Sequence, residues 1–253
     1  MKALATFQLP GLSSLPRPFC ALVRDAPCVT VDGVYGNTNS YPYRARQRRF
    51  EIIKPMIERI IEEKGVCRIA DVGGTEYYWI IARDFVDQSN VEIHLLNMEP
   101  QCPINRDKFI GYPMSAGDLG QFGDRSFDMV HSNSVIEHVG GWPQMKDMAA
   151  QVRRLAPSYY VQTPNFWFPV EPHFRAPMFH FLPEQLRYRA LMSFNLGFGG
   201  RRRSVDDAMQ AVQSASLLDK RQMQTLFPDG DIRHEKFGPL TKSLMAIRDA
   251  NRQ

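Results

Sequence analysis

The sequence lacks any long apolar run. The short apolar segment at residues 1–7 is interrupted by Pro10 and Gly11. It is therefore too short for the apolar core of a signal peptide. No stretch approaches the ~20 apolar residues that span a bilayer. We therefore expect a cytoplasmic protein with no membrane span.

Cysteines are few, and their spacing is uninformative. The chain has four of them, Cys20, Cys28, Cys67 and Cys102. None belongs to a Cys-x-x-Cys pair, and no histidine follows at a spacing typical of zinc sites. Reduced thiols are the usual state in the cytoplasm. We expect free thiols and no bound metal.

A strong excess of one charge is also absent. Lys and Arg (31) exceed Asp and Glu (27) by four, and the basic runs at residues 44–49 and 201–203 are short and far apart. Nucleic-acid binding usually needs a larger basic patch, and such runs are more often solvated faces. A nucleic-acid partner is therefore not expected. Contact of either run with a phosphate or an anionic membrane surface is a minor alternative.

The sequence has neither of the common nucleotide-binding fingerprints. No Gly-Lys-Ser/Thr P-loop occurs. The segment that contains the glycines of residues 71–75 (DVGGT) does not fit the Gly-x-Gly-x-x-Gly pattern. Tyr77 and Tyr78 occupy positions that a pyrophosphate would need open. These absences disfavour NAD and ATP as ligands.

What the sequence does have is an alternation of apolar runs and helical patterns. Short apolar runs at residues 67–72, 91–98, 110–114, 127–132 and 159–162 predict strands, and helices are expected at residues 46–64, 77–86 and 143–155. Parallel strands need crossover connections, so this rhythm favours an α/β fold with helices on both faces of a mostly parallel sheet. Alternating runs at residues 232–237 and 241–248 predict a C-terminal β-hairpin.

Three regions differ in composition. Residues 1–45 are rich in Pro, Gly, Ser and Asn, which predicts an irregular N-terminal extension. Residues 46–253 are expected to form one domain. Within it, residues 166–228 begin with an aromatic and Pro-rich stretch and continue into two candidate helices, at residues 205–217 and 220–227. We interpret this part as a lid or acceptor-binding insertion.

Three segments together resemble the class I S-adenosylmethionine-dependent methyltransferases, in the subgroup described as methyltransferase type 11. They are DVGGT at residues 71–75, GDL at 117–119 ahead of SFDMV at 126–130, and VIEHV at 135–139. The resemblance covers roughly residues 68–248. It implies a doubly wound, seven-stranded Rossmann-like methyltransferase fold and S-adenosylmethionine as the cofactor.

The resemblance also implies which residues contact the cofactor. In the family, the first glycine loop lies under the methionyl part, a role that falls here to Asp71, Gly73 and Gly74. The third glycine of the family's usual Gly-x-Gly-x-Gly is missing, and Thr75 and Tyr77 occupy the two later positions. An acid after the second strand holds the ribose hydroxyls; the candidates are Asn97 and Glu99, and Glu99 is preferred because it is the carboxylate.

Further family positions follow along the chain. Asp118 matches the acid that accepts a hydrogen bond from the adenine amino group, and Leu119 would offer its backbone N–H. The alternative for Asp118 is a turn residue between two glycines. Ser132 and Asn133 end the fourth strand, next to the expected position of the methyl group.

Candidate catalytic residues are three histidines. His138 follows the fourth strand, and His173 and His180 lie among the aromatic side chains of the insertion. Any of them could accept a proton from the acceptor, although a lone histidine is more often structural. The aromatic residues suit an apolar acceptor pocket, or they only pack the insertion onto the sheet.

The sequence therefore predicts methyl transfer from S-adenosylmethionine to a small-molecule, lipid-linked or glycan acceptor. The tetrapeptide typical of amino-directed DNA methyltransferases is absent after the fourth strand, where Ser132, Asn133 and Ser134 stand. The alternative is a catalytically inactive, methyltransferase-like module that binds cofactor or a partner. The acceptor atom and the oligomeric state are not predicted.

Overall fold

The computed structural model describes residues 38–250, which contain one seven-stranded mixed sheet. Its strand order is β3-β2-β1-β4-β5-β9-β8. This arrangement confirms the expected doubly wound, seven-stranded α/β fold with its terminal hairpin. The strands are β1 (Cys67–Val72), β2 (Val91–Asn97), β3 (Phe109–Pro113), β4 (Met129–Asn133), β5 (Ser158–Pro164), β8 (Asp231–Phe237) and β9 (Leu240–Arg248).

The first five strands of the sheet are parallel, so their carboxyl ends share one edge. β1 pairs with β2 on one side and with β4 on the other, and β9 enters antiparallel beside β5. The chain order reverses between β1 and β4. Open α/β sheets bind ligands at such a switch point, outside the carboxyl ends of the strands.

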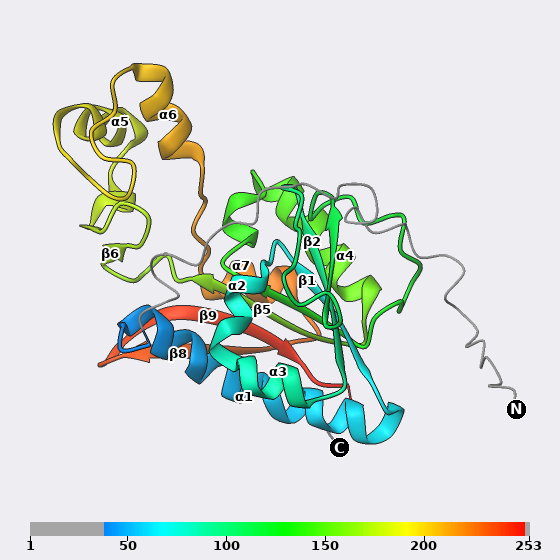
Figure 1. The fold of residues 1–253 in the computed structure, drawn as a ribbon. Helices are drawn as coiled ribbons and strands as arrows, with labels where there is room; N and C mark the ends of the chain where they lie inside the picture. Colours follow the sequence, from blue (N-terminus) through cyan, green and yellow to red (C-terminus); the bar gives the residue numbers. More distant parts are fainter. Residues whose placement is uncertain (1–37, 251–253) are drawn as a thin grey trace, which may run out of the picture.

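Helices cover both faces of the sheet (Figure 1). One face packs against α1 and the helical turns that follow β1, and the other against α4 and α7, forming two separate apolar cores. The alternation along each strand explains this, because neighbouring side chains point to opposite faces. The helices are α1 (Tyr41–Lys64), α2 (Glu76–Trp79), η3 (Ile80–Ala82), α3 (Arg83–Gln88), α4 (Trp142–Leu155) and α7 (Lys220–Leu226).

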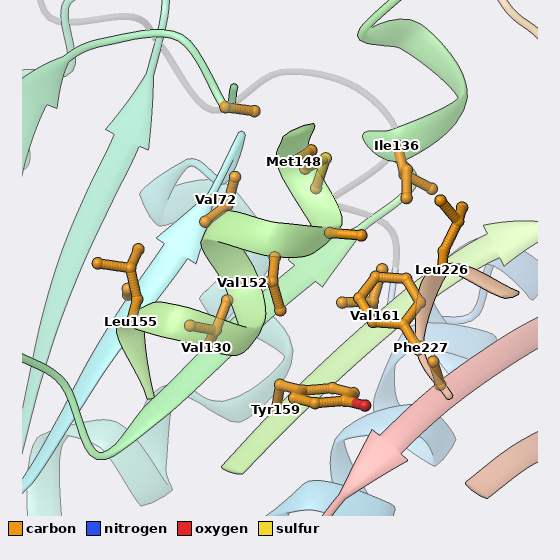
Figure 2. Close-up of a cluster of buried hydrophobic side chains, with 14 of the residues drawn as sticks. Val72, Val130, Ile136, Met148, Val152, Leu155, Tyr159, Val161, Leu226 and Phe227 are labelled. Atoms are coloured by element: carbon orange, nitrogen blue, oxygen red, sulfur yellow. The ribbon is translucent and has the colours of Figure 1, made fainter. Parts of the chain in front are cut away.

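The core under α4 is the larger of the two. Figure 2 shows Met148, Val152 and Leu155 of α4 against Val130 and Val161 of the sheet, all of them fully buried. Burying each such side chain contributes about 1.5–3 kcal/mol. α4 therefore fixes the position of the loop that precedes it, which carries part of the candidate site.

Helix α1 begins five residues before the expected start at Arg46, which corrects the predicted limit of the irregular extension. Ser40 is the N-cap, and its hydroxyl accepts a hydrogen bond from the backbone N–H of Tyr43. Pro42 lies in the first turn, where a missing N–H costs nothing. Ser and Pro are typical of irregular chain, but here Ser40 and Pro42 mark a helix start. The remainder of the expected extension, residues 1–37, lies outside the described residues.

Residues 166–217 form a lobe set apart from the sheet (Figure 1). Its own small core contains Phe179, Leu191, Ala208 and Val212. The lobe leaves and rejoins the domain at one place, because Asn165 and Leu218 form a β-bridge. Its elements are β6 (Val170–Glu171), β7 (Ala176–Pro177), η5 (Phe179–Phe181), α5 (Glu184–Ser193) and α6 (Val205–Gln213).

Two other boundaries differ from expectation. α7 was assigned to the insertion, but Met223 and Leu226 pack it into the core beside α4. The single helix expected at residues 77–86 is divided by the 3-10 turn η3. No helix among residues 38–250 is long and apolar enough to cross a membrane.

Candidate functional site

A cavity of ≈ 660 Å³ lies at the carboxyl ends of four neighbouring strands. Gly73 after β1, Asn97 at the end of β2, Met114 after β3 and Ser134 after β4 line it. The remaining wall comes from the loop after β4 and from α4. The lining residues are Gly73, Leu96, Asn97, Met98, Met114, Ser115, Ala116, Gly117, Ser134, Val135, His138, Val139, Gly140, Gln144 and Asp147.

The glycine loop after β1 forms one side of this cavity. Gly73 has φ +72°, a conformation that residues with a side chain rarely adopt. A Cβ atom at Gly73 would lie 2.5 Å from a methyl carbon of Val135. Both observations explain why glycine is needed here. The loop passes close to the segment after β4, and this approach sets the floor of the cavity.

Asp71 does not line the cavity but supports the loop from below. Its side chain is buried, with Oδ2 accepting a hydrogen bond from Trp79 Nε1 (2.8 Å) and Oδ1 one from His131 Nδ1 (2.6 Å). A Cβ atom on Gly74 would meet Oδ2 at 1.8 Å. The two predicted cofactor residues are therefore packed on each other, with the Asp71 side chain buried beneath a partly exposed Gly74. Thr75 is the N-cap residue of α2, without a capping hydrogen bond.

Asn97 lines the cavity, whereas Glu99 does not. The amide of Asn97 donates to the carbonyl oxygens of Gly73 and Gly74, both at 3.1 Å, and its oxygen accepts from the backbone N–H of Glu99. Asn97 thus joins the end of β2 to the glycine loop. The Glu99 carboxylate is exposed, and within residues 38–250 it has no ion pair or side-chain hydrogen bond.

The segment after β3 meets the cavity through Ser115, Ala116 and Gly117 rather than through the two residues expected there. Asp118 is exposed, and Leu119 is fully buried in the core. The backbone N–H of Asp118 donates to the Ser115 carbonyl, closing a turn. Asp118 therefore adjoins the cavity-lining turn without lining the cavity itself.

Ser132 and Asn133, at the end of β4, were predicted to contact the cofactor, whereas Ser134, which follows them, was not. Ser132 is buried and donates to the Val72 carbonyl, and Asn133 accepts a hydrogen bond from Arg49. Neither lines the cavity. Ser134 does, and its φ of +57° is unusual for a residue other than glycine. Such strained backbone recurs at ligand-binding sites.

Two of the three predicted histidines meet at the edge of the cavity. The Nε2 atoms of His138 and His173 lie 3.1 Å apart. The Nδ1 atom of His138 lies 2.7 Å from the Ser214 carbonyl oxygen, and that of His173 lies 2.6 Å from a carboxylate oxygen of Glu171. The pair therefore connects the loop after β4 with the lobe.

Burial and neighbouring charges shift the pKa values around this pair. Burial lowers the pKa of His138. It also opposes charge on His173, but the hydrogen bond and charge of Glu171, with Glu137, raise the pKa of His173 overall. Burial raises the pKa of the Glu137 carboxyl to about 7. One Glu137 oxygen accepts from the Thr163 hydroxyl at 2.9 Å.

His180 lies apart from this pair. Its Nε2 atom is 2.7 Å from the Phe166 carbonyl oxygen, which it serves as a hydrogen-bond donor within the lobe. It lines a second cavity of ≈ 350 Å³ together with Glu171 and the aromatic residues Phe166, Phe174 and Phe179. This cavity lies between the lobe and the start of α4, at Gly140 and Gly141.

The main cavity differs from the other large hollow in the charges that line it and in its place in the fold. Among the described residues that line it there is no Lys or Arg, and Asp147 contributes a carboxylate. A larger hollow of ≈ 990 Å³ lies between α1 and α3, far from the carboxyl ends of the strands, and is lined mostly by polar and charged residues. We therefore take the cavity at the strand ends as the candidate site.

Sequence reasoning found the loops of the site but not all of its walls. Gln144 and Asp147 of α4 were missed because their spacing on that helix is ordinary for a solvated face. The positive φ of Ser134 could not be predicted from the sequence. Serine rarely adopts such a φ, so its presence does not indicate one.

No protein-family model matches the chain, and no curated protein matches it. Solved structures of similar fold include a possible exported protein from Bordetella parapertussis, at 14% identity and TM-score 0.46, covering 73% of this chain and 62% of that one. A putative methyltransferase from an antibiotic biosynthesis pathway of Anabaena variabilis has 14% identity and TM-score 0.41, covering 72% and 64%.

The 1,6-didemethyltoxoflavin-N1-methyltransferase of Burkholderia thailandensis has 10% identity and TM-score 0.45, covering 88% of this chain and 91% of that one. Its structure contains 1,6-didemethyltoxoflavin and S-adenosylhomocysteine. The present chain spans less than two thirds of the Bordetella and Anabaena chains. Similarities at this level do not assign an activity, which has to be argued from the site.

Proposed function

We propose that the protein binds S-adenosylmethionine in the cavity at the strand ends and transfers its methyl group to an acceptor held under the lobe. The observation that carries this proposal is the composition of the cavity wall. The cavity has the volume and mixed polarity of a small-molecule site. Its lining within residues 38–250 includes the carboxylate of Asp147 and no Lys or Arg, which suits a cationic nucleoside better than a phosphate-bearing dinucleotide or ATP.

The residues present fit such a cofactor. Leu96, Met114 and Val135 offer apolar surface for a flat base, and Ser115 and Gln144 offer hydrogen-bonding groups. The glycine loop leaves room for the methionyl part. Asn97 lines the cavity and holds that loop through the carbonyls of Gly73 and Gly74, whereas Glu99 lies outside the lining and has no role in the proposal.

The cofactor, when bound, supplies an already activated methyl group on a sulfonium. The chain then has to align the acceptor and exclude water. His138 lines the cavity and touches His173 of the lobe. We assign this pair to the reacting atom of the acceptor, and the pair could also take a proton from a hydroxyl or ammonium group.

The lobe of residues 166–217 is the part that we assign to acceptor recognition. Its second cavity is lined by aromatic rings and by Glu171, Glu184 and Arg187. Apolar walls with a few polar groups suit a small molecule, a lipid-linked compound or a glycan. The closeness of Glu171 to His173 links this cavity to the methyl donor site.

Calorimetric titration with S-adenosylhomocysteine tests the proposal, with NADH and ATP as comparison ligands. We expect saturable 1:1 binding of S-adenosylhomocysteine and none of the phosphate-bearing ligands. Equal or tighter binding of NADH would overturn the proposal. Absence of all binding to a folded chain would favour a methyltransferase-like module without activity.

A further inference from the structure

We propose that Glu137, His138 and His173 form a binding site for a divalent transition-metal ion such as zinc. Their candidate ligand atoms all lie within 4.8 Å of one another. Glu137 and His138 lie in the 3-10 turn η4 (Ile136–His138) after β4, and His173 comes from the lobe. The cysteine and histidine spacing, from which no metal was expected, could not show this site because the fold brings its ligands together.

The hydrogen bonds at Nδ1 fix the tautomers of both histidines. The Ser214 carbonyl can only accept, so Nδ1 of His138 carries the hydrogen. The buried Glu171 carboxylate likewise accepts from Nδ1 of His173. In the neutral rings, both Nε2 atoms therefore present lone pairs to each other at 3.1 Å. Two lone pairs at this distance repel, unless a proton or a metal ion lies between them.

The surroundings of the two rings match those of metal-binding histidines. Such a histidine usually donates its second N–H to a carboxylate or a backbone carbonyl, which orients the ring and raises its basicity. His173 does so to Glu171, and His138 does so to Ser214. The backbone N–H of Phe174 in turn donates to Glu171, which holds the carboxylate in place.

Glu137 provides an independent indication. Its side chain is 1% exposed, and its Oε1 atom has no hydrogen-bond partner within the described part of the chain. Leaving a buried carboxylate oxygen unpaired is costly. A cation beside Glu137 would remove that cost.

Two imidazoles and one carboxylate are a usual ligand set for zinc, with water or substrate in the fourth place. At zinc–nitrogen distances of about 2.0–2.1 Å, two ligands of a tetrahedron lie roughly 3.3 Å apart, close to the 3.1 Å between the two Nε2 atoms. The fourth place would face the acceptor, a point that rests on the proposed methyl transfer, whereas metal binding itself does not.

The test is metal binding by the purified full-length chain in the absence of methyl donor. After treatment with a chelator and removal of the chelator, the chain is titrated with Zn²⁺ by calorimetry, and bound metal is counted by mass spectrometry. We expect one ion per chain. His138→Ala and His173→Ala should each weaken binding at least tenfold, and Glu171→Gln should weaken it about 10–100-fold.

His234→Ala is the matched control, because it removes an exposed histidine of β8 outside the cluster and should leave zinc binding unchanged. Circular dichroism checks that each variant is folded, and the exposed position of His138 makes its variant the least disruptive. No zinc binding by the folded wild-type chain would overturn the proposal and leave a proton shared between the rings. Zinc binding that survives both His138→Ala and His173→Ala would overturn it too.

Discussion

At the scale of single residues, the site depends on a few side chains that hold the backbone of its loops in place. Asn97 is the clearest case, because its amide holds the carbonyls of Gly73 and Gly74. Asp71 also supports the glycine loop, because its buried carboxylate is held by hydrogen bonds from Trp79 and His131. We expect a substitution of Asn97 to affect ligand binding and a substitution of Asp71 to affect the stability of the fold.

Asn97→Ala should weaken S-adenosylhomocysteine binding about tenfold. The substitution removes two hydrogen bonds that brace the glycine loop, each worth about 1 kcal/mol, and the loop then has to be ordered on binding. Calorimetry gives the dissociation constant. Asp118→Ala is the control, since Asp118 is exposed and does not line the cavity. The account is contradicted at this point if Asp118→Ala weakens binding more than Asn97→Ala.

Asp71→Ala should lower the free energy of unfolding by roughly 3 kcal/mol, because it leaves two buried N–H groups without an acceptor. Urea unfolding followed by tryptophan fluorescence measures this change. Asp206→Ala, in the exposed first turn of α6, serves as the control and should change stability little. Equal stability of the two variants would show that Asp71 is not a structural residue.

The sequence predicted the loops of the site better than the contacts within it. Gly73, Asn97 and His138 could be found because they lie at or after the ends of strands in a recognisable order. The contact between His138 and His173 could not be predicted, since 35 residues separate them and the lobe alone decides where His173 lies. The burial of Asp71 could not be predicted either, because an acid near the end of a strand has the same sequence pattern whether its side chain faces a ligand or the core.

At the scale of elements, the start of α1 shows how a capping signal can be misinterpreted. Ser40→Ala should cost about 1 kcal/mol of stability, since it removes the N-cap hydrogen bond of a helix that covers one face of the sheet. Thermal or urea unfolding measures the loss. Ser40→Asp keeps an acceptor beside the helix N-terminus and should retain wild-type stability. A loss with Ser40→Asp as large as with Ser40→Ala would contradict the assigned cap.

The ion pair between α1 and the C-terminal hairpin should make stability depend on pH. Arg49 donates to both carboxylate oxygens of Glu235. Burial opposes charge on Glu235, but the charge and hydrogen bonds of Arg49 lower its pKa overall. A carboxylate with a lowered folded-state pKa stabilises the fold above its unfolded pKa of about 4.3, and this contribution is lost as the pH falls through the folded value.

Glu235→Gln should therefore be less stable than the wild type at pH 7, and the difference should shrink below about pH 4.3. Urea unfolding at pH 7, 5, 4 and 3.5 measures it for both chains. Glu58→Gln on the exposed face of α1 is the control for loss of a surface carboxylate. A difference between wild type and Glu235→Gln that stays constant over this range would refute the assignment.

Helices and strands could be predicted from the sequence wherever the apolar residues had a single clear periodicity. The strands and the hairpin lie within two residues of their expected limits because apolar runs and alternation are unambiguous there. α5 was missed because prolines and aromatic residues surround it and only Leu191 of its residues is buried. The turn η3 interrupts the predicted helix after β1, where Tyr78 and Trp79 are buried against the sheet.

At the scale of the whole molecule, the two ends of the lobe meet at one place on the domain. The bridge between Asn165 and Leu218 brings its two ends together. Replacing residues 167–216 by two glycines should therefore leave a chain that still unfolds cooperatively and binds S-adenosylhomocysteine with an affinity within a few-fold of wild type. Loss of donor binding with the fold intact would show that the lobe belongs to the donor site.

The central claim is that the cavity bounded by the ends of β1, β2, β3 and β4 holds the methyl donor. A crystal structure of the protein soaked with S-adenosylhomocysteine would locate the donor site. We expect ligand density between Gly73, Met98, Ser115 and Val135, with the sulfur toward His138. Density in the hollow between α1 and α3 instead, with the cavity at the strand ends empty, would contradict it.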